Sequence, residues 1–133
     1  MSRRKFLSTA AALTAGTAMA GIPVESYANK RGIIAHQVYF WLKRPDSEED
    51  KKKLIEGINS LKKIETVREM HIGVVAATEK RSVIDDTWSV SELIYFDDLA
   101  GQATYQVHPL HEAFVKNYSQ LWSKVVVYDS ALI

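Results

Sequence analysis

The alternation of hydrophobic and polar positions becomes regular at residue 33. Residues 33–43 (IIAHQVYFWLK) repeat with the two-residue period of a β-strand. One face carries Ile34, His36, Val38, Phe40 and Leu42, and the other carries Gln37, Tyr39 and Trp41. Because both faces hold large apolar groups, the pattern predicts a strand that is covered on both sides.

Residues 47–64 follow a helical period instead. Ser47 can cap the first free amides, and the acidic residues 48–50 come next, where a helix carries partial positive charge. Apolar residues then recur at helical spacing, at Leu54, Ile55, Ile58, Leu61 and Ile64. Lysines 51–53, 62 and 63 fall mostly outside this stripe, which predicts a helix with one buried face and one solvated face.

Two more alternating stretches, residues 67–77 (VREMHIGVVAA) and 87–96 (TWSVSELIYF), predict strands on either side of a charged loop at 78–86. In the second of them, Trp88 is predicted to share a face with Val90 and Phe96.

A second helix is predicted to begin at Asp97 or Asp98 and to break at Pro109. Proline lacks an amide hydrogen and disfavours helix at His108, so the helix must end there and restart with Pro109 in its first turn. Residues 125–129 (VVVYD) predict the last strand. The order β-α-β-β-α-β is that of a ferredoxin-like α+β sandwich.

Two helices can cover only one face of a four-stranded sheet. The apolar groups on the second face would then form a patch larger than the roughly 300 to 600 Å² that monomers expose. We therefore expect a second copy of the chain to pack there, forming a homodimeric α+β barrel that buries at least about 1,600 Å².

The first 32 residues lack this periodicity. Residues 1–20 combine Arg3-Arg4-Lys5, a mildly apolar segment and the small-residue end Ala18-Met19-Ala20, as in a signal peptide of the twin-arginine type. Residues 21–32 are typical of a flexible linker, which leaves residues 33–133 as the single domain. The expected location is exported, periplasmic or extracellular in a bacterium.

Charge and composition exclude several functions. Residues 1–20 carry three positive charges and no negative ones, so their removal changes the formal net charge from +1 to −2. The remaining chain has no basic surface for nucleic acid and no polybasic patch for a membrane. The absence of cysteine excludes disulfides, thiol nucleophiles and thiolate metal sites.

Residues 105–111 (YQVHPLH) are the densest group of proton-transfer side chains. Imidazole titrates near neutrality and a phenol can polarise an enolate oxygen, so Tyr105 and His111 could enolise or condense a carbonyl compound with no cofactor. Both residues could also be structural. His111 shares a helical stripe with Val115 and Tyr118, which suits a buried histidine bonded to the backbone, and a buried tyrosine usually packs with a satisfied hydroxyl.

The other histidines leave further alternatives open. His36 is either an orienting partner for a polar group or a satisfied core histidine, and His71 is interpreted as structural. His108 precedes a proline and can cap the new helix. A metal site built from His36, His108 and His111 is disfavoured, because a bent joint does not present the last two as a regular pair. We expect no metal.

Two motifs carry a resemblance that covers nearly all of residues 33–133. They consist of His36, Val38 and Phe40 in the first strand and Tyr105, His108, Pro109 and His111 at the helix joint. Together they resemble the stress-responsive dimeric α/β-barrel (Dabb) family, and the resemblance implies the same ferredoxin-like dimer.

The family includes the plant olivetolic acid cyclase, which closes a linear polyketide by proton transfer. Similarity to it implies catalytic roles for Tyr105, His111 and His36. The implied ligand-binding wall consists of Val38, Phe40, His108, Phe114 and Trp122. A further pocket histidine of the cyclase falls on Val90, so the substrate need not be similar.

Two hypotheses follow. The first is a cofactor-free enzyme, or a small-ligand site, for a carbonyl-bearing or aromatic compound. The second is a non-catalytic stress-response protein whose stable homodimer is itself the function. An enzyme requires an open cavity onto which Tyr105 and His111 both face.

Overall fold

The computed structural model describes residues 30–133, in which Gly32–Leu132 form one compact unit. The predicted signal peptide and residues 21–29 of the predicted linker lie outside the described residues. Four antiparallel strands form one sheet in the order β2-β3-β1-β4. The strands are β1 (Ile34–Leu42), β2 (Glu69–Gly73), β3 (Val90–Phe96) and β4 (Trp122–Ala131).

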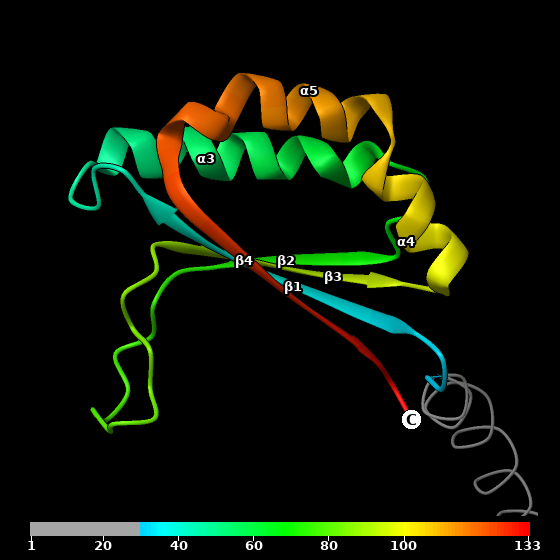
Figure 1. Ribbon diagram of the computed structural model, residues 1–133, viewed down its shortest axis with the longest axis horizontal. Helices are drawn as coiled ribbons and strands as arrows, with labels where there is room; N and C mark the ends of the chain where they lie inside the picture. The colour runs from blue at the N-terminus through cyan, green and yellow to red at the C-terminus, as the bar shows by residue number, and fades with distance from the viewer. Residues whose placement is uncertain (1–29) are drawn as a thin grey trace, which may run out of the picture. The chain divides into compact units, whose positions relative to one another are not determined.

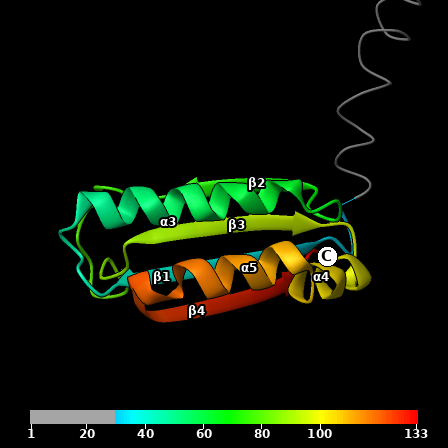
Figure 2. The same ribbon diagram turned by 90° about the horizontal axis from the view of Figure 1, so that it is seen from above.

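The helices all lie on one face of this sheet (Figure 1). They are α3 (Glu48–Ser60), α4 (Leu99–Gln106) and α5 (Pro109–Tyr118), with short 3-10 turns η1 (Leu61–Lys63) and η2 (Ser119–Leu121). Viewed from above, α3 lies over the β2–β3 half and α5 over the β1–β4 half (Figure 2). The ferredoxin-like α+β fold is therefore present, and its core lies between the helices and the sheet.

Helix α3 begins where the acidic run predicts. The Ser47 hydroxyl accepts from the Asp50 amide, and Arg44 donates two hydrogen bonds to the Asp50 carboxylate. The guanidinium beside it holds the pKa of Asp50 below its ordinary value. The buried apolar stripe of the helix, with Leu54 and Ile58 fully buried, faces the sheet.

Helices α3 and α5 approach closely at Gly57. A Cβ added there would lie 2.8 Å from ring atoms of Tyr118, so the absence of a side chain lets the Tyr118 ring pack against the helix backbone. Such an overlap would force side chains or backbone to shift in a packed layer. This contact brings α5 over β1 and β4, where the cavity described below lies.

The predicted break at Pro109 is confirmed. Helix α4 is capped by Asp98, whose carboxylate accepts from the Gly101 amide, and it ends at Gln106. His108 is extended, and its Nδ1 accepts from the Leu110 amide at 3.1 Å, so it caps α5 with Pro109 in the first turn. The joint turns the chain from one end of the sheet back over it.

The boundaries of three strands differ from the prediction. Strand β2 ends at Gly73 because its pairing with β3 ends at Ser91. Residues 87 and 88 do not join β3, because the Asp85 carboxylate accepts from both the amide and the hydroxyl of Thr87, which holds a turn. Strand β4 is longer than predicted, since it pairs with β1 along nearly its whole length.

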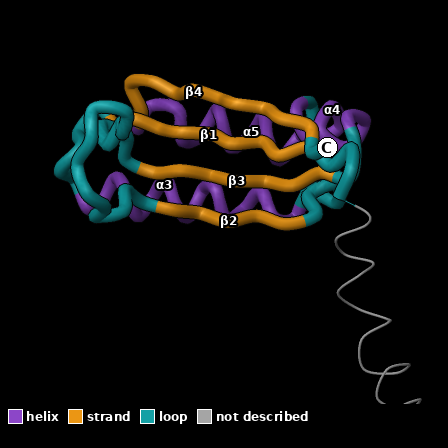
Figure 3. Tube along the Cα trace, turned by 90° about the horizontal axis from the view of Figure 1, so that it is seen from below, coloured by secondary structure: helices purple, strands orange, loops and turns teal. Residues whose placement is uncertain are grey.

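Among the described residues, no helix covers the face of the sheet opposite α3 and α5, which is termed here the outer face (Figure 3). Its apolar side chains remain partly exposed, as the two-faced first strand predicted; they are Tyr39, Trp41, Leu93, Tyr95, Val126 and Tyr128. Trp88 packs edge-on against Tyr39 at 5.2 Å between ring centroids, so its predicted place beside Val90 is wrong.

Within residues 30–133, every helix is too short or too polar to cross a lipid bilayer.

Candidate functional site

A cavity of about 330 Å³ lies between the β1–β4 half of the sheet and helices α4 and α5. It is lined by His36, Val38, Phe40, Glu92, Tyr105, Gln106, His111, Phe114, Val115, Ser119, Trp122, Val125 and Val127. Val115 on α5 and Val125 and Val127 on β4 are partly exposed, which places the opening between this helix and the edge strand. Most of the wall is apolar, as in many small-molecule sites.

Strand register orders the wall into a polar end and an aromatic end. His36 lies opposite Asp129, Val38 opposite both Val127 and Glu92, and Phe40 opposite Val125. At the Phe40 end, three aromatic rings gather within 5.0 to 6.2 Å of one another between centroids: Phe40, Phe114 and Trp122. A ligand lying along β1 would therefore meet rings at one end and titratable groups at the other.

A carboxyl and a phenol form the centre of the polar end. Glu92 is 2% exposed, and its Oε1 accepts a hydrogen bond of 2.9 Å from the Tyr105 hydroxyl. Burial raises the pKa of Glu92 to about 7, although the bond from Tyr105 opposes this. Burial, and then the Glu92 charge, raises the pKa of Tyr105, so its hydroxyl keeps the proton.

His111 lies beside this pair. Its ring centroid is 4.8 Å from that of Tyr105, and the ring is hydrogen-bonded to the backbone of Gln106. Partial burial, followed by the nearby imidazole of His36, lowers the pKa of His111, so the ring is neutral at neutral pH. A neutral imidazole that donates one N–H to a carbonyl keeps its second nitrogen as a proton acceptor.

His36 forms a second pair across two strands. Its Nδ1 lies 2.5 Å from Oδ1 of Asp129, and the imidazole is 5% exposed whereas the Asp129 side chain is 49% exposed. The carboxylate holds the ring in one orientation and selects the tautomer with the proton on Nδ1. His36 also lies 5.7 Å from Tyr105 between ring centroids.

The fold brings most of the predicted site residues together. His36, Tyr105 and His111 all line the cavity, and so do four predicted wall residues: Val38, Phe40, Phe114 and Trp122. Trp122 is the first residue of strand β4, so it does not continue the helical stripe of His111 and Tyr118. Tyr105 and His111 therefore face the common space that an enzyme requires.

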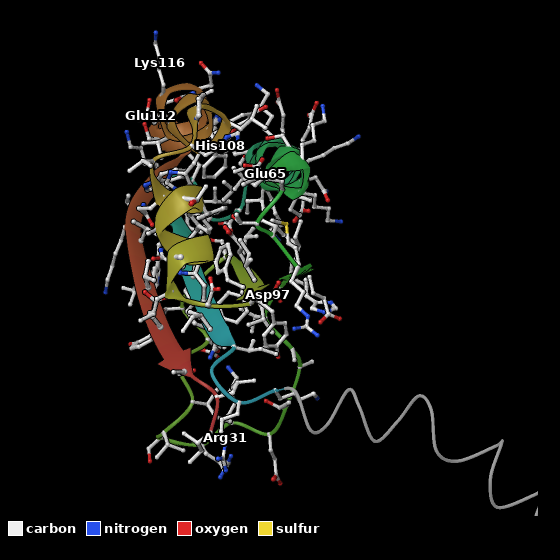
Figure 4. All side chains as sticks on the ribbon, turned by 90° about the vertical axis from the view of Figure 1, so that its right-hand side faces the viewer. Arg31, Glu65, Asp97, His108, Glu112 and Lys116 are labelled. Atoms are coloured by element: carbon white, nitrogen blue, oxygen red, sulfur yellow. The ribbon has the colours of Figure 1, made fainter. Side chains whose placement is uncertain are left out.

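His108 is the predicted site residue that the structure does not bring to the cavity wall. Its Nδ1 caps α5, and its Nε2 lies 3.3 Å from the Glu65 carboxylate, toward which it points from the joint (Figure 4). The described residues contain no cluster of three potential metal ligands. His71 lies on exposed β2 beside Glu69, outside the cavity.

The sequence reasoning missed two titratable residues of the site, Glu92 and Asp129. Glu92 carried a usable signal, because it is the charged residue at a buried-face position of the alternating third strand, between Val90 and Ile94. Asp129 carried little, since its pairing with His36 depends on the register of β4 against β1. Neither residue belongs to the YQVHPLH segment.

The arrangement can donate and accept protons at several points of one apolar space. His111 offers a neutral base, Tyr105 a hydroxyl, and Glu92 a carboxyl that is partly protonated near neutral pH. Groups with such pKa values suit general acid–base catalysis. The same contacts also satisfy the buried polar atoms, as a purely structural role would require.

Solved structures show the same fold at low sequence identity. A Dabb family protein from Mesorhizobium loti is 23% identical with a TM-score of 0.63, over 77% of this chain and 99% of that one. A hydroxynitrile lyase from Passiflora edulis is 21% identical with a TM-score of 0.65, over 77% and 95%. A dimeric protein of unknown function from Bacteroides fragilis is 21% identical with a TM-score of 0.60, over 77% and 98%.

No curated protein matches the chain. The family model of the stress responsive A/B barrel domain matches residues 34–132, which span all four strands and all the helices described above. The resemblance of the two histidine motifs is thereby confirmed, and the chain belongs to the stress responsive A/B barrel domain (Dabb) family.

Proposed function

We propose that the cavity binds a small, largely apolar carbonyl or aromatic compound and catalyses proton transfer on it without a cofactor. One observation carries this proposal: a buried carboxyl–phenol pair and a neutral imidazole share the wall of an otherwise apolar cavity. A buried ionisable carboxyl is costly to a fold. That cost is easier to understand where the group acts on a ligand.

Each group has a distinct role in this proposal. His111 removes a proton from carbon next to a carbonyl, using the nitrogen that is not bonded to Gln106. Tyr105 donates to the carbonyl oxygen as it becomes an enolate. When Glu92 is protonated it can donate to Tyr105, which turns the phenol proton toward the ligand. Protonated His111 can return that proton to the product, while His36, oriented by Asp129 through Nδ1, keeps its other nitrogen free to accept a hydrogen bond from the ligand.

The hydroxynitrile lyase among the structural neighbours supports an enzymatic reading, because a protein of this fold is named there as a catalyst. It does not define the reaction of this chain. The departure at Val90, where the cyclase has a further pocket histidine, leaves the substrate open.

Hydrogen–deuterium exchange tests proton abstraction without knowledge of the natural substrate. Phenylacetone carries one aromatic ring and acidic protons next to its carbonyl. In D₂O, we expect the protein to accelerate loss of its methylene signal in proton NMR. His111→Ala should reduce that acceleration at least about tenfold, because it removes the general base.

The matched control is His71→Ala, which makes the same change on an exposed strand outside the cavity. It should leave exchange unchanged, and both variants should melt within a few degrees of wild type. The effect of Tyr105→Phe is harder to assign to catalysis, because this change also removes the hydrogen-bond partner of buried Glu92. That loss should lower the free energy of unfolding by about 1 to 3 kcal/mol. Absence of exchange in wild type, together with such a stability loss, would favour the non-catalytic alternative.

We further propose that two copies pack their outer faces together. The partly exposed aromatic and aliphatic groups of that face support this, as does the description of structural neighbours from Bacteroides fragilis, Thermobifida fusca and Jannaschia as dimeric. The helices lie over the opposite face, and the cavity lies between them and the sheet. This pairing therefore leaves the cavity opening between α5 and β4 outside the contact between the two sheets.

Export remains a proposal that rests on residues 1–20. The twin-arginine start predicts a mature protein that lacks this segment and lies outside the cytoplasm. The intact mass of protein recovered from the cell envelope measures this, and a full-length mass in the cytoplasmic fraction would contradict it.

A further inference from the structure

We propose that Glu92 makes the cavity selective for uncharged compounds that carry a hydrogen-bond donor such as a hydroxyl, and that it excludes carboxylates. This inference rests on the proposed function, to which it adds the class of ligand. Neither the family match nor the structural neighbours assign a role to this residue.

The charge of the cavity wall is the first observation. The lining residues include one carboxyl, Glu92, and no lysine or arginine. Lys124, the basic residue of the neighbouring strand β4, lies 4.6 Å over the Trp41 ring on the outer face. A carboxylate ligand would therefore lose its hydration, find no cation, and face another carboxylate at short range.

The free bonding capacity of Glu92 is the second observation. A carboxylate accepts about four hydrogen bonds, whereas Tyr105 is the partner that the structure gives Glu92 among residues 30–133. Glu92 lines the cavity. Its second oxygen has no hydrogen-bond partner among the described residues, and it is not fully buried. That oxygen can accept from a ligand hydroxyl without breaking the bond to Tyr105.

The volume of the cavity and the order of residues along its wall indicate the remaining features of the ligand. A cavity of roughly 150 Å³ already holds benzene, so about 330 Å³ admits one ring with a side chain. Glu92 lies opposite Val38, and Phe40 follows two residues along the strand, at about 7 Å. A ring packed among Phe40, Phe114 and Trp122 can thus place a hydroxyl on a short arm near Glu92.

Other titratable groups face Glu92 from each surrounding element. They are Tyr105 from α4, His111 from α5 and His36 from β1, with Asp129 of β4 behind His36. At acidic pH the His111 imidazole can gain charge and attract an anion, so a change of pH alone does not isolate the effect of Glu92. A comparison of wild type with Glu92→Gln isolates the effect of this carboxyl group.

The test titrates the mature protein with benzyl alcohol and with benzoate, followed by the indole N–H signal of Trp122 in NMR. At pH of about 8.5, benzyl alcohol should bind at least about tenfold more tightly than benzoate, which corresponds to the loss of one charge-assisted contact. In Glu92→Gln this gap between the affinities for the two compounds should shrink to about threefold or less. Glu69→Gln, which removes an exposed carboxylate on β2, should leave it unchanged.

A gap that persists in Glu92→Gln would overturn the inference, as would equal binding of both compounds to wild type. In either case the cavity would remain a ligand site and the proposed function would stand. Failure of both compounds to bind would overturn the proposed function as well. Glu92→Leu is a second variant that removes the charge, and it should also close the gap.

Discussion

Replacing Glu92 with glutamine is expected to abolish a fall in stability of about 3 kcal/mol that the wild-type protein undergoes between pH 4.5 and 7. The folded pKa of Glu92 is raised from the ordinary value of 4.5 to about 7. Between these values the folded protein keeps a proton that the unfolded chain has released. Its contribution to stability is therefore full below about 4.5 and is lost as pH rises through 7.

Glutamine preserves the contact while removing the charge. Its amide oxygen can accept from the Tyr105 hydroxyl as the Glu92 carboxylate does. At pH 8 the variant should consequently be more stable than wild type, and near pH 4.5 the two should be nearly equal. The measurement is urea unfolding of both proteins at several pH values, expressed as the difference in the free energy of unfolding.

The difference curve isolates Glu92 from other titrating groups. The pKa of His111 is lowered by burial, so its contribution has the opposite sign and falls as pH drops below about 6.5. Because His111 is present in both proteins, its contribution cancels to first order in the difference between variant and wild type. Glu69→Gln serves as the matched control and should give a flat difference curve. A flat curve for Glu92→Gln as well would mean that the carboxyl is not shielded from water.

The second large effect is expected at the outer face. Leu93 lies on β3 between Gln37 of β1 and His71 of β2, so it lies near the middle of the sheet. Leu93→Glu would bury two carboxylates in a twofold-symmetric interface. We expect the dimer dissociation constant to rise a hundredfold or more, so that wild type sediments as a dimer at micromolar concentration and the variant as a monomer.

Leu110→Glu makes the same chemical change on the exposed surface of α5. It should leave the protein dimeric, because α5 lies on the opposite side of the sheet (Figure 1). Far-ultraviolet circular dichroism should show folded protein for both variants. A dimeric Leu93→Glu protein, or a monomeric wild type, would contradict pairing through the outer face.

Local pattern was enough to predict the elements of this fold. Alternation located three strands, and the period of the apolar stripe located α3, because burial on one face imposes a period that depends on the element alone. The break at Pro109 was equally predictable, since the missing amide hydrogen acts within one turn. Boundaries were less predictable: Thr87 joins a turn because its amide and hydroxyl donate to the Asp85 carboxylate, which competes with strand pairing.

The site was predictable where it lies in one motif or on one strand face. Tyr105 and His111 are placed by the same helix joint, and His36, Val38 and Phe40 by strand alternation. His108 was predicted both as a cap and as a wall residue, and the structure shows the cap, because its ring is held by the Leu110 amide and by Glu65. A capping bond and a cavity contact compete for one side chain.

The sequence by itself determined the order of elements, the apolar second face of the sheet, the helix joint and the family. The tertiary structure alone decided that Glu92 meets Tyr105 and that Asp129 meets His36. Those residues are 13 and 93 positions apart in the chain. Their contacts depend on strand register and on the seating of α4 over the sheet, which arise from packing of the whole domain and leave no local period in the sequence.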